Sequence, residues 1–219
     1  MANPAKSLES LTSISQPKQA RSEDTARRIL DAAQALIERE GLAGLSIPEV
    51  VRRARSSTGS FYARFRDKNG LLAALEERFF EDMHRLLDEL ADPARWAGRP
   101  MRELLLVCNR EMLRRLRQHA RLVCAFAYRS AHEAGFATRV KRFHERLTDR
   151  MRALFLARRD EMTHPDPELA VALAIEFVFT FMQARVQYAA QEGAAAIDDE
   201  RLAAELTRMF LAYAGVPPD

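Results

Sequence analysis

The sequence predicts an all-α protein of about nine helices. Ala, Leu, Arg and Glu, which are strong helix formers, dominate the 219 residues. Only 8 glycines occur, and runs of β-branched residues, which favour strands, are rare. Hydrophobic residues make up 47% of the chain, enough for a real core. The formal net charge of +3 does not by itself demand a nucleic acid as partner.

Residues 1–21 are expected to form a flexible N-terminal tail. The segment is polar and contains Pro4, Pro17 and several serines, a composition that is typical of disordered ends. Two interpretations remain open: an end without a role, or a basic arm that reaches into a DNA minor groove.

The first helix is predicted to begin near Ser22 and to end at Gly41. Glu23 and Asp24 lie at its positive dipole end. Gly41 is expected to end it as a C-cap. One apolar stripe at helical spacing supports the helix: Ala26, Ile29, Leu30, Ala33, Leu36 and Ile37.

The second helix is predicted to run from Ser46 to Arg55. Ser46 and Glu49 have the spacing of a capping box, in which each side chain would bind the other residue's free N–H group. Pro48 falls in the first turn, where no intrahelical N–H bond is lost.

The third helix is predicted to be very short, with Ser57 as its cap and its end near Arg64. Phe61 and Phe65 are four residues apart and should both point into the core. Gly59 in the first turn costs about 1 kcal/mol against Ala, which suggests that this backbone must approach a ligand. The outward positions are Thr58, Ser60, Tyr62, Ala63 and Arg64.

The charge around these two helices favours binding to phosphates. Between Arg52 and Lys68 there are six cations and one anion, Asp67, and such a local excess is typical of DNA-binding surfaces. Asp67 is expected to cap a fourth, long helix that reaches Asp92-Pro93. The second and third helices then form a helix-turn-helix.

The motifs of this segment appear in the order and at the spacing of a known family. They are Ile29-Leu30-Asp31-Ala32-Ala33, Gly41, Ser46 to Ala54, Ser57-Thr58-Gly59-Ser60-Phe61-Tyr62-Ala63-Arg64-Phe65 and Lys68-Asn69-Gly70-Leu71. From about Thr25 to Leu75, the chain resembles the DNA-binding domain of the TetR family of transcriptional regulators. Three positions depart from the family pattern. Arg55 stands where Gly is common, and a positive φ there would cost of order 1 kcal/mol; Ser56 replaces an apolar residue, and Val51 a small one.

The resemblance implies three parts and a set of DNA contacts. The parts are the tail, a helix-turn-helix domain over 22–68, and a helical effector-binding and dimerisation domain over 69–219. Phosphate contacts are implied for Ser57, Ser60, Tyr62 and Lys68. Contacts to base edges are implied for Thr58, Ala63 and Arg64, and Arg64 is suited to guanine. Gly59 would let the backbone of the helix approach the DNA. The resemblance also implies a DNA contact for Ser46, the cap of the second helix.

Five further helices are expected in the larger domain, over 102–118, 120–133, 136–162, 168–192 and 198–214. The segment 169–189 is apolar nearly all round and must be buried on every side. A partner subunit that pairs through the last two long helices would bury it. The alternative is a central helix in the core of one subunit.

Aromatic side chains are the candidate ligand-binding residues of this domain: Phe126, Tyr128, Phe143, Phe155, Phe177 and Phe181. They would line an apolar pocket, although aromatics at helical spacing are also ordinary core residues. His132, His144 and His164 form neither a metal spacing nor a triad. No catalytic residue, metal or cofactor is therefore predicted, and Cys108 and Cys124 are expected to be reduced.

These expectations add up to a ligand-responsive transcriptional regulator in the cytoplasm. As is most common in the family, it would be a repressor that binds a pseudo-palindromic operator as a homodimer and is released by a small molecule. The main alternative is a helical small-molecule-binding or adaptor protein whose helix-turn-helix has weak or no specific DNA affinity. A helical enzyme for a lipid-like substrate is the third, but it lacks a catalytic constellation. No membrane partner is expected, because the most apolar run, 169–184, is too short for an unassisted span.

Overall fold

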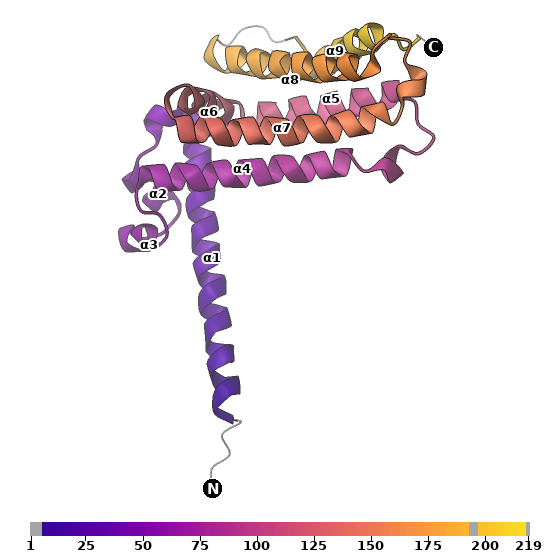
Figure 1. Ribbon diagram of the computed structural model, residues 1–219. Helices are drawn as coiled ribbons and strands as arrows, with labels where there is room; N and C mark the ends of the chain where they lie inside the picture. Colours follow the sequence, from indigo (N-terminus) through magenta and orange to yellow (C-terminus); the bar gives the residue numbers. More distant parts are fainter. Residues whose placement is uncertain (1–5, 193–196, 218–219) are drawn as a thin grey trace. The chain divides into compact units, whose positions relative to one another are not determined.

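The computed structural model describes residues 6–192 and 197–217, and within these ranges every regular element is helical (Figure 1). Nine α-helices and three short 3-10 helices occur there, without a strand. The prediction of an all-α protein is confirmed. The chain divides into two compact units, Met1–Glu77 and Arg78–Asp219, and each is described by itself.

The first unit is a small helical domain with a helix-turn-helix. Its core is formed by apolar side chains that are fully or almost fully buried, among them Ile29, Leu36, Val50, Phe61 and Leu71. The unit contains α1 (Lys6–Glu40), α2 (Ile47–Arg53), α3 (Thr58–Tyr62) and the first part of α4 (Lys68–Leu90).

Helix α1 begins earlier than the sequence predicts. Its first residue is Lys6, not a residue near Ser22, so 6–21 are helical where a flexible tail is predicted. Ser22 is therefore an interior residue and no N-cap. Two features of the sequence allow the extension: apolar residues recur every three residues at 8, 11 and 14, and most other residues there tolerate a helix. Residues 1–5 of the predicted tail lie outside the described residues.

Of the helix caps predicted in the first unit, the structure supports the one at Gly41 and contradicts the one formed by Ser46 and Glu49. Gly41 follows α1 with a φ of 72°, a conformation that favours glycine. Ser46 is the N-cap of α2, but its side chain makes no capping hydrogen bond, and the predicted capping box is wrong. Its partner Glu49 instead accepts hydrogen bonds from Arg52 Nε at 2.8 Å and Arg53 Nε at 2.6 Å, because charged donors one turn away attract the carboxylate more strongly.

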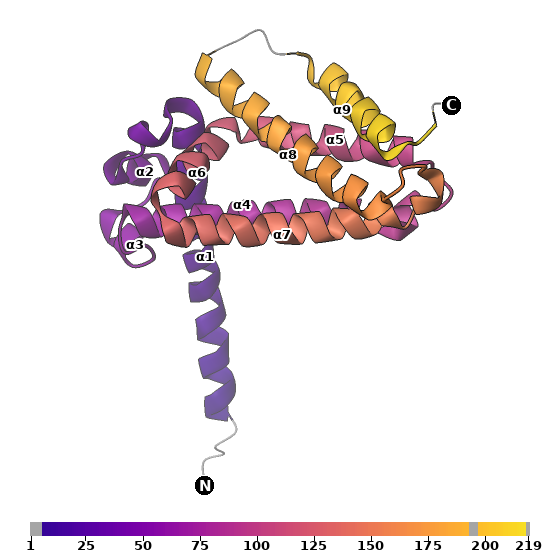
Figure 2. The same ribbon diagram turned by 45° about the horizontal axis from the view of Figure 1, so that its top comes forward.

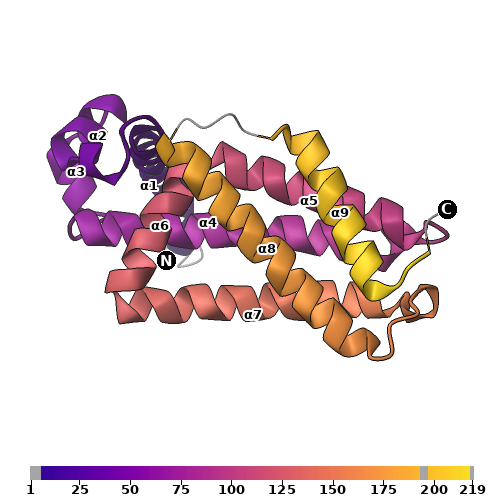
Figure 3. The same ribbon diagram turned by 90° about the horizontal axis from the view of Figure 1, so that it is seen from above.

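The second unit is a layered helical bundle. Helix α9 packs against α5, and α8 packs against α6 and α7, so that α8 and α9 form an outer layer (Figures 1, 2 and 3). The bundle consists of the rest of α4, α5 (Met101–Gln118), α6 (Ala120–His132), α7 (Ala134–Leu156), α8 (Pro167–Glu192) and α9 (Asp199–Ala214).

Two buried polar side chains of this bundle, Asn109 and Trp96, donate hydrogen bonds. Asn109 Nδ2 of α5 donates to Thr207 Oγ1 of α9 at 2.9 Å, and both residues are buried. Trp96, which is fully buried, donates from Nε1 to the carbonyl oxygen of Leu90 at 2.7 Å. Such bonds remove the cost of burying a polar group, about 1–3 kcal/mol each, and the bond between Asn109 and Thr207 also joins α5 to α9.

Helix α8 has one buried and one exposed apolar face. Val171, Val178 and Val186 are among the residues of its buried face. The apolar side chains exposed on α8 and α9 are Leu169, Leu173, Phe177, Phe181, Tyr188, Met209 and Tyr213. From Pro167 to Ala190, α8 is long and apolar enough to cross a membrane by length and composition alone, so the expectation that this run is too short is wrong. It packs with its buried face against α5, α6, α7 and α9 in the second unit.

Candidate DNA-binding surface and effector cavity

The short helix α3 is held by a cap and an aromatic anchor. Ser57 is its N-cap, and Ser57 Oγ accepts from the backbone N–H of Ser60 at 3.1 Å, as the sequence predicts. The same hydroxyl donates to Ser60 Oγ at 3.0 Å. Phe61 is fully buried and packs against Phe65 with 5.5 Å between ring centroids. This core contact determines which face of α3 points outward.

The outward face carries the residues predicted to contact DNA. Tyr62 is 55% exposed, and its ring packs edge-on against Phe61 at 5.3 Å. The exposed residues of this surface are Ser46, Ser57, Thr58, Gly59, Tyr62 and Ala63, and Ser60, Arg64 and Lys68 are half-buried. The structure therefore gathers the hydroxyl groups and small side chains of α3 on the surface of the first unit, where a phosphate backbone can reach them.

Gly59 lies at an open position of this face. A Cβ atom built on it would meet only Ser57 Oγ, at 3.9 Å. The glycine is thus not required for packing inside the unit. Its missing side chain leaves the backbone of the first turn accessible from outside.

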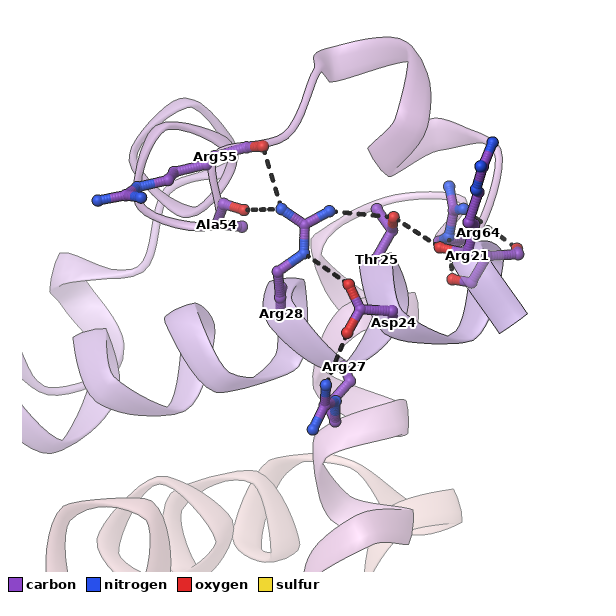
Figure 4. A network of polar contacts seen from close by, with 9 residues as sticks. Arg21, Asp24, Thr25, Arg27, Arg28, Ala54, Arg55 and Arg64 are labelled. Carbon is purple, nitrogen blue, oxygen red and sulfur yellow. Dashed lines mark hydrogen bonds and ion pairs between the residues drawn. The ribbon is translucent and has the colours of Figure 1, made fainter. Parts of the chain in front are cut away.

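The turn between α2 and α3 contains the strained residue that the sequence predicts. Arg55 has a φ of 48° and is the one non-glycine residue with positive φ in the described part of the chain. The neighbouring carbonyl oxygens are bound by an arginine from α1: Arg28 Nη1 donates to Ala54 O at 3.1 Å and Arg55 O at 3.3 Å (Figure 4). Asp24 orients Arg28 through Nε at 3.2 Å. This clamp stabilises the strained turn.

The role of Arg28 in this turn could not be predicted from the sequence. Arg28 occupies a polar position on α1, and its partners lie 26 and 27 residues further along the chain. The only local signal was Asp24, one helical turn earlier, and that spacing is common on exposed helices.

Arg64, predicted to read guanine, is engaged within the first unit. Its guanidinium donates from Nη1 to Ser60 O at 2.7 Å, from Nε to Ser22 O at 3.1 Å and from Nη2 to Ser22 Oγ at 3.1 Å. The side chain thus joins α1 to the end of α3. A base contact by Arg64 would require these bonds to break, and it stays a prediction.

The second unit contains a cavity of about 370 Å³ among α4, α5, α6, α7 and α8. Five phenylalanines line it: Phe79, Phe80, Phe126, Phe143 and Phe179. Four polar side chains line it as well: Ser130, His144, Gln183 and Gln187. Its volume lies in the range of about 300–1,000 Å³ that is typical of small-molecule sites.

Only Phe126 and Phe143 of the six predicted pocket residues line this cavity. Phe155 packs edge-on against Phe210 at 5.1 Å in another part of the core. Tyr128 is 60% exposed and stacks on His132, with 4.3 Å between the ring centroids. Phe177 and Phe181 are exposed on the outer face of α8. Helical spacing did not reveal which face of each helix points to the cavity.

The cavity residues that the sequence analysis missed had one usable signal. Gln183 and Gln187 are polar positions four residues apart in a mostly apolar segment, which places both on one face of α8. Phe79, Phe80 and Phe179 gave no such signal, because aromatic residues at helical spacing are usual in cores.

Burial controls the protonation of His144 and Cys108. The pKa of His144 is lowered by burial, so its imidazole is neutral near pH 7. Burial raises the pKa of the Cys108 thiol to about 12, and a thiol of this kind is unreactive. In the described ranges, no group of three or more His, Cys, Asp or Glu side chains is placed to hold a metal ion.

Residues 29–75 match the sequence model of the family described as bacterial regulatory proteins, tetR family. Curated proteins give no match to this chain. Solved structures share the fold: a transcriptional regulator from Rhodococcus sp. RHA1 aligns with a TM-score of 0.68 and 20% identity, covering 88% of this chain and 99% of its own.

Two other structures align almost as well. The fatty acid degradation regulator FadR from Bacillus halodurans has a TM-score of 0.67 at 17% identity and covers 85% of this chain and 94% of its own. A TetR transcription regulator from Haloarcula marismortui has a TM-score of 0.66 at 18% identity, and the alignment covers 88% of this chain and 97% of that one. The matched family consists of transcriptional regulators, not of enzymes. Residues 29–75, which contain the helix-turn-helix of α2 and α3, are thus similar to the bacterial regulatory proteins of the tetR family, and the described chain shares its fold with solved transcriptional regulators.

Proposed function

We propose that the protein is a repressor that binds a pseudo-palindromic operator as a homodimer and releases it when a small molecule enters the second unit. The observation that carries this proposal is the outward face of α3. There Ser57, Thr58, Gly59 and Tyr62 are exposed on a helix whose other face is anchored by Phe61. A dimer would place two such helices in successive major grooves, about 34–36 Å apart.

The chemistry of the side chains decides which residues would contact phosphates and which would contact bases. Ser57, Ser60, Tyr62 and Lys68 would bind phosphates and fix the register. Thr58 and Ala63 would face base edges, and Ser46 adds a hydroxyl at the start of α2. Arg64 would read guanine once released from Ser22 and Ser60, or else position α3 through those bonds.

A second copy of the chain is the proposed partner of the exposed face of α8 and α9. Leu173, Phe177, Met209 and Tyr213 border a hollow of about 420 Å³ on this face. Contiguous apolar surface of this kind marks an interaction site in soluble proteins. Pairing with the same face of a second copy would bury both faces at once in a two-fold symmetric contact.

Helix α4 would transmit the signal between effector and DNA. Its residues from Lys68 to Glu77 belong to the first unit, while Phe79 and Phe80 further along the helix belong to the second unit and line the cavity. A ligand that moved the second half would change the separation of the two α3 helices. By linkage, ligand and operator then weaken each other by the same factor, typically with about 1–3 kcal/mol of coupling.

A mobility-shift titration tests the proposal, with DNA from upstream of the protein's own gene and unrelated DNA of equal length. The proposal expects tighter binding to the upstream DNA and one dimer per site. Equal binding to both at every salt concentration would favour the alternative, a helical ligand-binding or adaptor protein. The engagement of Arg64 with Ser22 and Ser60 is the observation that favours this alternative. Either protein would act in the cytoplasm and without a membrane partner.

A further inference from the structure

The cavity of the second unit is lined by uncharged side chains. Among the described residues on its wall, none is Asp, Glu, Lys or Arg. The single titratable group is His144, whose pKa is lowered by burial and which is therefore neutral near pH 7. A charged ligand would lose its hydration in the cavity without gaining an ion pair there.

The apolar wall has flat aromatic surfaces. Phe80 and Phe143 are stacked with 4.9 Å between centroids and 18° between planes. Phe79 meets Phe126 edge-on at 5.4 Å. Aromatic faces and edges arranged in this way prefer a planar aromatic guest, which can stack on one ring and meet another edge-on.

The polar groups of the wall come from three helices. Gln183 and Gln187 lie one turn apart on α8, Ser130 comes from α6 and His144 from α7. Each Gln amide offers two donors and one acceptor oxygen, and a neutral imidazole offers one of each. This set can bind a carboxamide, a hydroxyl or a carbonyl group, which need both donors and acceptors but no opposite charge.

A groove between α7 and α8 adjoins the cavity and shares Ser130, Val140, His144 and Phe179 with it. The charged residues along this groove are one base and three acids: Lys141, Glu145, Asp149 and Glu176. The ring of Phe179 meets His144 edge-on at 5.0 Å where the two spaces adjoin. A negatively charged molecule would approach through a groove with an excess of acidic groups.

We propose that the effector is an uncharged, planar aromatic molecule with one amide-type or hydroxyl group, which enters by the α7–α8 groove. The aromatic part stacks on the Phe80–Phe143 wall, and the polar group binds Gln183 and Gln187. The class of ligand follows from the cavity itself, and only the role of that ligand as an effector rests on the proposed function.

Three probes of equal shape test the ligand class on the full-length protein, without DNA. N-phenyl-1-naphthylamine, which fluoresces in apolar sites, is bound first and then displaced by 1-naphthamide, 1-naphthoate or 1-naphthylmethylammonium at pH 7.5. We expect the neutral amide to displace it at a concentration at least about tenfold lower than either ion. The proposal would be overturned if naphthoate or the ammonium displaced the fluorescent probe at the same concentration as the amide.

Matched variants locate the site. Ala127 lines the cavity, whereas Ala153 is exposed on α7. Ala127→Phe should weaken binding of the amide at least about tenfold by filling the space, and Ala153→Phe should leave it unchanged. Equal effects of the two would place the ligand elsewhere.

A second pair of variants tests the polar contact without adding volume. Gln183→Leu and Gln187→Leu should each lower the affinity for 1-naphthamide until it is close to the affinity for unsubstituted naphthalene. The circular dichroism of both variants should match that of the wild type. An undiminished preference for the amide would exclude the glutamines as its partners. Because no DNA is present, failure of these measurements leaves operator binding untouched, and absence of operator binding leaves them interpretable.

Discussion

Single residues on α3 separate the requirements of folding from those of DNA binding. Gly59 is the clearest case, since a methyl group there meets only Ser57 Oγ at 3.9 Å. Gly59→Ala should therefore keep or slightly raise stability, by up to about 1 kcal/mol from helix propensity. It should also weaken operator binding at least about tenfold if the backbone approaches DNA, as measured by mobility shift.

A glycine in the second unit provides the control. Gly135 lies on α7, where an added Cβ comes no nearer than 4.0 Å to Arg139. Gly135→Ala should have the same small effect on stability and none on operator binding. If Gly59→Ala bound the operator as tightly as the wild type, no close approach of the backbone would take place.

Arg28 and Arg27 form a matched pair for the strained turn. Both contact Asp24, but only Arg28 binds the carbonyl oxygens of Ala54 and Arg55 (Figure 4). Arg28 is partly exposed, and solvent screening limits its contribution. Arg28→Ala should lower the free energy of unfolding by about 1 kcal/mol in urea titrations, and Arg27→Ala by less than about 0.5 kcal/mol. Equal losses would mean that the clamp on the turn contributes nothing of its own.

At the scale of the element, the outer face of α8 tests dimerisation. Phe177 is 48% exposed in the apolar face of α8 and α9, and Tyr128 is an exposed aromatic on α6. Phe177→Glu should convert the dimer to a monomer in sedimentation velocity, because a buried charge without a partner is costly in an interface. Tyr128→Glu should leave the dimer intact. A dimer that persisted in Phe177→Glu at equal concentration would place the interface elsewhere.

The helix-turn-helix was predictable because its signals are local. Ser57 and Ser60 close the cap within four residues, Gly41 ends α1, and Phe61 and Phe65 share one face. The start of α1 was not predictable from caps, since Ser22 is suited to a cap but serves as an acceptor for Arg64 within the helix. Its role depends on a partner 42 residues away.

The cavity was only partly predictable, because five helices build it. Phe126 and Phe143 were identified as aromatic residues, but so were Phe177 and Phe181, which face outward. All four lie on helices with apolar residues on more than one side. Which face points inward depends on how α8 crosses α6 and α7, and that information is spread over distant segments of the chain.

For the whole molecule, half-buried histidines predict how stability depends on pH. Burial lowers the pKa of His84, His119 and His144; nearby Arg115 and Arg78 lower that of His119 further, and Asp82 opposes them. Because the folded pKa values lie below the unfolded value of about 6.5, the unfolded chain binds more protons between the two. Stability is therefore complete above pH 6.5 and decreases as the pH falls through the folded values.

The melting temperature should accordingly decrease from pH 7 to pH 5, and the decrease should be smaller in His144→Gln than in the wild type. A melting temperature that is constant over this interval would contradict the lowered pKa values of the three half-buried histidines.

The salt dependence of operator affinity tests the central claim most directly. For each phosphate contact that is lost, the slope of log affinity against log salt concentration should shrink by about one. We expect this change in Lys68→Ala, at the start of α4, and not in Lys141→Ala, on α7. A slope that is the same in both variants and the wild type would contradict a DNA-binding surface formed by α3 and the start of α4.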